Sequence, residues 1–479
     1  MLDMQVVLRS LQFGNEIITT KIIADLIKEN ASVQINLVRK YNAYCAIGLP
    51  ITSRSEPKTG KANNKLVNDY RGEIVDQIVG YLFGNPVTYS LKIEVGQKAE
   101  DTTYKKNLQV LKDFNQLNNS EELDAETGKM MSVCGRAARL LYIDRDGKER
   151  QMDVRPWEVI FVYDQSLDEV QYAMRYYNVY DMSTGKPQTR TRVEWYDDKN
   201  VSYYISSDKG YVADYMQVQI DTKVVPVSSQ AHLFDRVPLI DFQNNSELLG
   251  DFEKTESLID GYDRVVSDAQ NEIEDLRLAY LIFKGVIPDE GVLAEAKRTG
   301  AFGCEKDDEI GYLTKSINDA FIENQKKSLR ENIYRFSKTV DVNADTFTGS
   351  GASGEARKWL LLALENRGST KERKFKSGIH TLFSIIVTAW KKKGININPN
   401  DIEVQLDRNL PAELKQEAEI QSMLKGIVSD RTRLKLFSII KDVDEEIRQL
   451  EVENDLKVDL DEVPIDKNIE DPDDGTVAE

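Results

Sequence analysis

The sequence predicts an α+β fold, mainly helical, in which helices flank one antiparallel β region. Three observations predict it. Apolar residues recur at helical spacing over residues 17–41 and again over residues 65–83. Over residues 136–243 the period changes to two, which is typical of strands. From residue 251 the helical period returns and continues, with short interruptions, to about residue 456.

The N-terminal part is expected to contain four helices and one strand. The helix predicted over residues 65–83 stops at Gly84-Asn85-Pro86, because Gly ends helices and Pro cannot continue them. Residues 87–95 then alternate as a strand, and residues 104–115 and 120–134 suggest two further helices.

The β region begins with a hairpin. Residues 138–154 alternate on both sides of Asp146-Gly147, a dipeptide that favours a two-strand turn. Further strands are predicted over residues 159–163, 170–177, 192–196, 201–206 and 237–242.

The C-terminal half reads as helices separated by short strands and loops. Residues 251–278 carry apolar side chains on one side and acids on the other. The remaining elements, in order, are a strand at 279–286, a loop with a short helix at 287–306, a strand at 309–313, a helix at 316–339, a loop of small residues at 346–354, a very long helix at 355–393, a strand at 402–406 and two or three helices within 411–456.

Composition excludes several classes of protein. The chain has 479 residues, three Cys far apart and two His. This argues against a disulfide scaffold, a Cys-rich zinc site and a catalytic triad built on His. The longest apolar stretch, residues 377–390, is too short to cross a bilayer, so we expect a soluble protein that folds in a cytoplasm, with no membrane partner.

Charge is unevenly placed along the chain. The net charge is −18, from 63 basic and 81 acidic residues. Residues 442–479 hold sixteen acidic and three basic residues, so they carry −13 and the rest only −5. Such a protein would not coat nucleic acid, because phosphate contacts need Lys and Arg.

Candidate chemical sites all have a plainer interpretation. Residues 349–354 match GxGxxG, but they follow no buried strand, so a mobile loop before a helix is favoured over a nucleotide site. Two acidic clusters, Asp251 with Glu253 and Glu256, and Glu272 with Glu274 and Asp275, could bind metal but are typical of a solvated helix face. His232 and His380 read as structural residues. We therefore predict no enzyme, no catalytic residue, no metal and no cofactor; a nucleotide-dependent enzyme and a metal-dependent nuclease remain the rival functions.

One basic cluster stands out on the helix predicted at 316–339. Lys326, Arg330 and Lys338 fall at steps of four and eight and would share a face, with Lys327 and Arg335 beside it. The alternative is an ordinary solvated face, paired with Asp319, Glu323 and Glu331.

Five segments in collinear order resemble portal proteins of tailed bacteriophages, in the large siphophage family common in hosts with Gram-positive walls. The first, NNKLVNDYRGEIVDQIVGYLFGNPV, resembles a helix that ends in a "YLxGxPV" turn. Another, DFEKTESLIDGYDRVVSDAQNEIEDLRLAYLIFKG, resembles a helix with the core "LIDxYxxxxSDxxNxxE". The five segments are residues 63–87, 133–163, 251–285, 347–375 and 426–455.

The resemblance implies a homo-oligomeric ring, typically of twelve subunits, at one vertex of the viral capsid. Double-stranded DNA would pass through its channel during packaging and ejection. The terminase large subunit would dock on it first and a head-completion (adaptor) protein later. Scaffolding and major capsid proteins would surround it. The protein would assemble in the host cytoplasm and reside in the virion, and the family has no known catalytic site. A self-assembling structural protein without DNA passage is the remaining alternative.

The family's parts map onto the chain by the same resemblance. The basic residues Lys326, Arg330 and Lys338, with Lys327 and Arg335, would face the channel. Thr346, Phe347, Thr348, Gly349, Ser350 and Gly351 would form a tunnel loop that approaches DNA. The expected regions are a wing (1–250), a stem helix (251–278), a clip (279–315), a second stem helix (316–339), the tunnel loop (340–354), a long wing helix with a return strand (355–410), a helical crown (411–456) and an acidic disordered tail (457–479).

Overall fold

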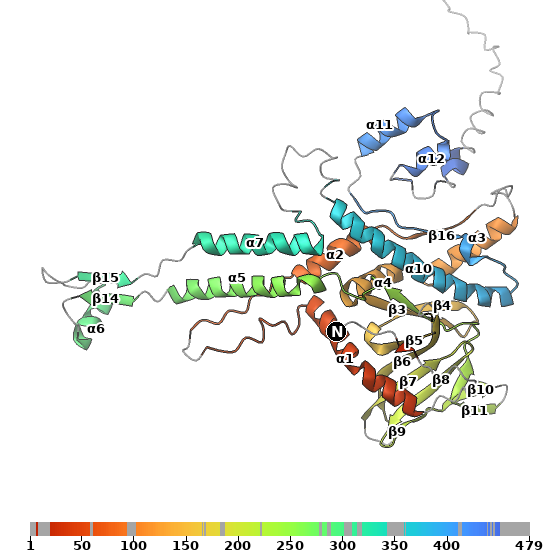
Figure 1. The fold of residues 1–479 in the computed structure, drawn as a ribbon, viewed down its shortest axis with the longest axis horizontal. Helices are drawn as coiled ribbons and strands as arrows, with labels where there is room; N and C mark the ends of the chain where they lie inside the picture. The colour runs from red at the N-terminus through yellow and green to blue at the C-terminus, as the bar shows by residue number, and fades with distance from the viewer. Residues whose placement is uncertain are drawn as a thin grey trace, which may run out of the picture. The chain divides into compact units, whose positions relative to one another are not determined.

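The computed structural model describes residues 6–7, 20–57, 61–92, 102–164, 166, 169–182, 187–220, 223–276, 280–284, 289–300, 309–313, 319–342, 359, 361–410, 414–437, 439–440, 443 and 446–450. Its helices and mainly antiparallel sheets confirm the predicted α+β class (Figure 1). The chain divides into two compact units, Met1–Asn409 and Leu410–Glu479. No helix in the described part of the chain is long and apolar enough to span a membrane.

Two helices open the first unit, α1 (Thr20–Tyr44) and α2 (Tyr70–Phe83). Helix α2 begins later than predicted, since residues 65–69 form neither helix nor strand. Asp69 caps it by accepting the N–H of Gly72 at 3.0 Å. The predicted stop is confirmed, since the chain leaves the helix at Gly84.

Two more helices and a small sheet follow. Helix α3 spans Thr102–Leu117, and α4 spans Ser120–Cys134, as predicted. Strand β2 (Thr88–Leu91) pairs antiparallel with β16 (Ile402–Gln405), which follows the short helix η4 (Pro399–Asp401). The described part of β2 is shorter than the predicted strand, whose last residues lie outside the described ranges.

The β region forms three sheets. The predicted hairpin is confirmed as β3 (Arg136–Ile143) and β4 (Glu149–Val154), with Gly147 at φ 73° in the turn, and β13 (Leu239–Gln243) completes that sheet. A hairpin of β10 (Met216–Ile220) and β11 (Lys223–Val227) stands apart. A seven-stranded sheet contains β1 (Val6–Val7), β5 (Val159–Tyr163), β6 (Val170–Asp181), β7 (Gln188–Tyr196), β8 (Asn200–Ser207), β9 (Gly210–Ala213) and β12 (Ser229–Ala231); the short helix η2 (Pro156–Glu158) precedes β5.

The pairing in these sheets is antiparallel except between β1 and β5. Strands β9 to β12 were not predicted. They are three to five residues long; β10 alternates apolar and polar residues, MQVQI, and was missed, whereas β9, β11 and β12 lack the run of alternation that predicts a strand.

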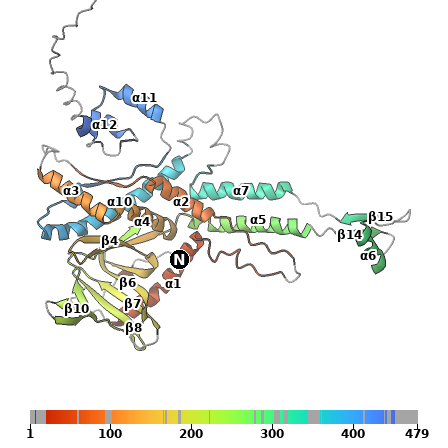
Figure 2. The same ribbon diagram turned by 180° about the vertical axis from the view of Figure 1, so that it is seen from behind.

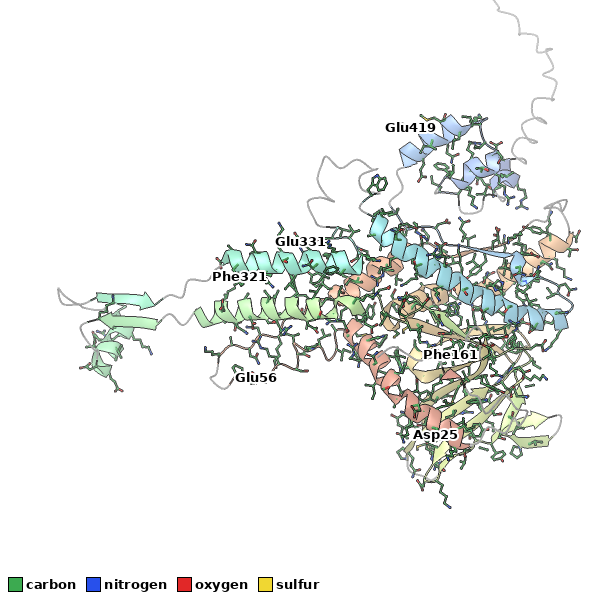
Figure 3. The ribbon with its side chains drawn as sticks, viewed as in Figure 1. Asp25, Glu56, Phe161, Phe321, Glu331 and Glu419 are labelled. Carbon is green, nitrogen blue, oxygen red and sulfur yellow. The ribbon has the colours of Figure 1, made fainter. Side chains whose placement is uncertain are left out.

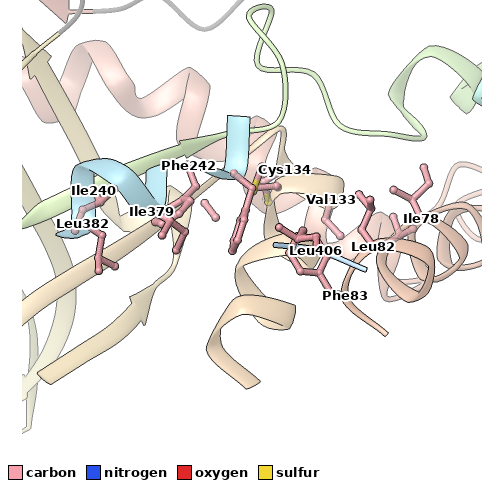
Figure 4. Close-up of a cluster of buried hydrophobic side chains, with 14 of the residues drawn as sticks. Ile78, Leu82, Phe83, Val133, Cys134, Ile240, Phe242, Ile379, Leu382 and Leu406 are labelled. Atoms are coloured by element: carbon pink, nitrogen blue, oxygen red, sulfur yellow. The ribbon is translucent and has the colours of Figure 1, made fainter. Parts of the chain in front are cut away.

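Helix α10 (Leu362–Lys392) supplies much of the core of the first unit. Figure 4 shows Ile379 and Leu382 of α10 beside Phe242 of β13. Gly378 permits this approach, because a Cβ atom there would lie 2.4 Å from the ring of Phe242. The helix was expected from residue 355, but Leu361 is a turn residue; residues 355–358 and 360 lie outside the described residues.

Helices α5 (Glu256–Leu276) and α7 (Asp319–Ser337) lie side by side in both views (Figures 1 and 2). A short helix, η3 (Glu253–Thr255), precedes α5. Between α5 and α7 the chain forms β14 (Tyr280–Lys284), α6 (Glu290–Thr299) and β15 (Glu309–Leu313). The two strands pair with each other antiparallel.

The second unit contains α11 (Leu414–Leu424) and α12 (Asp430–Lys435), in line with the two or three helices predicted there. Gln421 of α11 donates to the carbonyl of Arg433 in α12 at 2.6 Å. The acidic segment, residues 451–479, lies outside the described residues.

Candidate functional site

The α5–α7 helix pair carries the basic residues that the sequence singled out. Its contact face on α7 includes Leu329 and the buried Ile333. Gly261 of α5 lets Leu329 approach, with 3.8 Å between the Leu329 methyl and the position of a Cβ. Small and branched side chains thus bring the two helices together.

An extended segment, residues 61–69, runs along α5; we call it the arm. Three side chains of α5 at steps of four accept alternate backbone N–H groups of the arm. Asn271 accepts from Asn64 at 2.6 Å, Ser267 accepts from Leu66 at 3.0 Å, and Asp263 accepts from Asn68 at 2.8 Å.

This register has a simple geometric cause. Two residues of extended chain rise about 6.6 Å, and four residues of helix rise about 6 Å. An extended chain can therefore run antiparallel to a helix and meet an acceptor at every turn.

The arm and α7 lie on opposite sides of α5 in the view of Figure 3, where Glu56 marks the side of the arm and Glu331 marks α7. In the sequence, the polar residues Asp263, Ser267 and Asn271 recur at steps of four. We did not predict from this spacing that they bind another segment of the chain.

Helix α2 contacts the first half of α5 and the end of α7 through aromatic and polar side chains. The rings of Tyr70 and Tyr262 meet edge to face, and so do those of Tyr70 and Tyr334. The Tyr334 hydroxyl donates to Glu73 at 2.7 Å. Burial, and then this hydrogen bond, raise the pKa of Tyr334. The phenol therefore stays protonated and keeps its donor role.

Two further contacts fix the same place. Arg71 of α2 is buried and pairs with Asp260 of α5 at 2.5 Å. The Gln77 amide makes two bonds of 2.7 Å with the backbone of Val340, just beyond α7. Helix α2 therefore binds the N-terminal half of α5 and the C-terminal end of α7.

The five basic residues differ in whether an acidic side chain pairs with them. Lys326 is half-buried and pairs with Glu323 at 2.8 Å, and Arg330 pairs with Asp341 at 3.4 Å. Lys327, Arg335 and Lys338 are exposed. Among the described residues, no carboxylate pairs with Lys327 or Lys338.

The predicted common face is wrong for Lys338. Helix α7 ends at Ser337, and Lys338 follows with φ 59°, a left-handed conformation that breaks the helical repeat. Arg335 lies against the ring of Phe336, with 5.8 Å between the guanidinium carbon and the ring centroid. The tunnel-loop residues Thr346, Phe347, Thr348, Gly349, Ser350 and Gly351 lie outside the described residues, and so does the GxGxxG match.

The first acidic cluster is neutralised by cations. Asp251 pairs with Lys371 at 2.6 Å, Glu253 with Lys40 at 2.9 Å and Glu256 with Arg39 at 2.8 Å. Each carboxylate has a different partner, so the three do not converge. Within the described ranges, no three His, Cys, Asp or Glu residues could hold a metal ion together.

The two histidines make structural hydrogen bonds. His232 accepts the N–H of Phe234 at Nδ1, and its Nε2 lies 3.0 Å from the carbonyl of Asp197, so the neutral tautomer donates there. Burial lowers the pKa of His232, which favours that neutral form. His380 lies 2.9 Å from the Asn400 amide oxygen.

Known proteins match nearly the whole chain. The family model described as "Phage portal protein, SPP1 Gp6-like" matches residues 24–457. The portal protein of Bacillus phage SPP1 is 26% identical over 410 residues, covering 82% of this chain and 76% of that protein. The portal protein of Clostridium phage phiCD119 is 25% identical over 424 residues, covering 83% and 86%. The chain therefore belongs to the family of SPP1 Gp6-like phage portal proteins.

Proposed function

We propose that this protein is the portal subunit of a tailed phage, and that copies of it form a ring at one capsid vertex through which double-stranded DNA passes. The observation that carries the proposal is the family match over residues 24–457, which includes the α5–α7 pair and its basic residues. Terminase, a head-completion protein and the surrounding scaffolding and capsid proteins would be its partners, and twelve the expected number of subunits.

The channel surface would come from α7 and from Lys338, the residue that follows it. A conduit must let DNA slide in both directions, so a few weak phosphate contacts serve it better than tight binding. Lys327, Arg335 and Lys338 are exposed and would supply these contacts. Lys326 and Arg330 have acidic partners, so their contribution would require an exchange of partner. The loop of residues 346–351 would approach the DNA as well.

Electron microscopy of the purified full-length protein tests the ring. We expect a ring with a hole of about 30 Å or more, since duplex DNA is about 20 Å across. A compact monomer under all conditions would contradict the proposal. A ring that assembles normally but never retains DNA in a capsid would favour the alternative, a structural protein without DNA passage.

Charge reversal tests the channel surface. In Lys327→Glu with Arg335→Glu we expect rings of normal size but a loss of packaged DNA. The matched control is Lys391→Glu at the C-terminal end of α10, which changes charge away from α7 and should package normally. Equal packaging by both variants would remove Lys327 and Arg335 from the channel.

A further inference from the structure

A buried ionic junction joins α10 to the start of α5 and to the end of α7, which lie at the same end of the α5–α7 pair. The junction consists of Asp251, Ser337, Arg367 and Lys371. Asp251 lies five residues before α5, Ser337 is the last residue of α7, and Arg367 and Lys371 are one turn apart on α10. None of these contacts belongs to the basic surface described above.

Asp251 is almost fully enclosed. Its residue is 3% exposed, and its carboxylate accepts from Lys371 at 2.6 Å, Arg367 at 2.9 Å and Asn244 at 2.8 Å. Burial alone would raise its pKa, but the charges of Lys371 and Arg367 lower the pKa of Asp251 to about 2. The aspartate is therefore ionised whenever the protein is folded near neutral pH.

The backbone before α5 is pressed against α4. The Asp251 N–H donates to the carbonyl of Ser132 at 2.7 Å, and a Cβ on Gly250 would lie 2.5 Å from the carbonyl oxygen of Val133. Lys371 also donates to the Ser132 hydroxyl. The start of α5 therefore cannot move without disturbing α4 or α10.

Arg367 contacts the segment before α5 and the last residue of α7 at once. One nitrogen, Nη2, donates to the Asp251 carboxylate and to its backbone carbonyl at 2.6 Å, while Nη1 donates to the carbonyl of Ser337. The Ser337 carbonyl belongs to the last turn of α7, where carbonyls lack helical partners and cations are favoured. A planar guanidinium holds its N–H groups in fixed directions and can donate to both Asp251 and Ser337, whereas a lysine amine lacks this fixed geometry.

We propose that Arg367, supported by Lys371, is a positioning residue that couples the orientation of the α5–α7 pair to helix α10. The chain leaves α7 and returns as α10 through residues 338–361, so a direct bridge between the two helices bypasses this connection. A tilt of the α5–α7 pair would be transmitted directly to α10 and the core of the first unit. The coupling between the helices does not depend on the proposed function. Its role in DNA passage rests on that function.

Distance measurement by electron spin resonance tests the coupling. Labels are placed at Ser328→Cys on α7 and Ser377→Cys on α10, both exposed, with Cys45 and Cys304 replaced by Ala and labelled chains diluted among unlabelled ones. In Arg367→Met we expect the distance distribution to become about twofold wider than in the wild type.

The matched control is Lys376→Met on the same helix. Lys376 pairs with Glu372 at 2.6 Å and its side chain is 38% exposed, so it should leave the distribution unchanged. Arg367→Lys keeps the charge and the aliphatic stem but cannot hold both acceptors, and it should give an intermediate width. This milder variant decides the question if Arg367→Met does not fold. Widths equal to the control in both Arg367 variants would overturn the proposal.

Packaging gives the second measurement. Rings of Arg367→Lys should assemble as the wild type does but package DNA at least about tenfold less, since the α5–α7 pair would move without α10. Normal packaging despite a widened distribution would overturn the link to DNA passage alone. If the wild type forms no ring, the proposed function fails, and the distances still decide whether the coupling exists.

Discussion

The core around α10 and the α5–α7 pair are stabilised by different physics. Along α10, Phe375, Ile379 and Ile386 are almost fully buried, and aromatic rings from α2, β13 and α3 pack against the helix. Among the α5 side chains that the structure describes, two of the three buried ones, Asp263 and Ser267, are polar and serve as hydrogen-bond acceptors. Burial of apolar area contributes much to stability and tolerates small changes in the packing angle of a helix. Each hydrogen bond contributes less and depends on direction. Beyond its junction with α10, the α5–α7 pair should therefore shift at lower cost than α10 does.

The largest expected effect is in the α10 core. Phe375 is fully buried and its ring meets those of Phe83 and Phe242. Phe375→Ala should destabilise the first unit by about 3–5 kcal/mol, because it removes apolar burial and leaves a cavity. Denaturant unfolding measures this. The control Phe336→Ala, at a residue 55% exposed, should cost far less. Equal losses would contradict the contrast between the two regions.

A smaller effect concerns pH at the junction between the regions. The pKa of Asp251 is lowered to about 2 by Lys371 and Arg367, against burial, so its ionisation stabilises the folded state above the unfolded pKa of about 4. Stability from this group, about 3 kcal/mol, should be present at pH 5 and be lost as the pH falls from about 4 to 2.

Unfolding of Asp251→Asn over the same pH range provides the comparison. The variant should be less stable at pH 5, because Lys371 and Arg367 lose their partner. Its stability should also fall less steeply below pH 4. A slope identical to that of the wild type would show that Asp251 does not titrate as described.

The arm should be more sensitive to a lost acceptor than to a lost charge. Asp263→Ala removes the acceptor for two groups of Asn68, and we expect a loss of about 1–2 kcal/mol and faster hydrogen exchange at Asn64, Leu66 and Asn68. Asp263→Asn keeps one carbonyl acceptor. Burial raises the pKa of Asp263, so the charge is unfavourable there, and Asn should change stability by less than about 0.5 kcal/mol. A large loss in the Asn variant would mean that the charge itself holds the arm.

The smallest effect is expected for the ion pair on α7. Lys326 and Glu323 pair three residues apart, and the Glu323 side chain is 69% exposed. Lys326→Ala should change the free energy of unfolding by less than about 0.5 kcal/mol, because solvent screens such pairs. A larger loss would indicate that the half-buried stem of Lys326 contributes through packing.

The sequence alone determined the α+β class, helix α4, strands β5 and β15, the β3–β4 hairpin and the end of α2 at Gly84. These features depend on periodicity and turn chemistry within a few residues, which local sequence records. The order of five family-like segments also indicated the portal family, which the match over residues 24–457 confirmed.

Only the tertiary structure decided the arm and the junction. Residues 65–69 have a helical pattern but are not helical, because the backbone N–H groups of Leu66 and Asn68 find acceptors 201 and 195 residues further along the chain. Lys371 and Arg367 look like solvated helix charges in the sequence, yet they enclose Asp251, 116–120 residues away. No local pattern specifies such partners, because hydrogen bonds and ion pairs between distant residues depend on where the packed apolar elements place them.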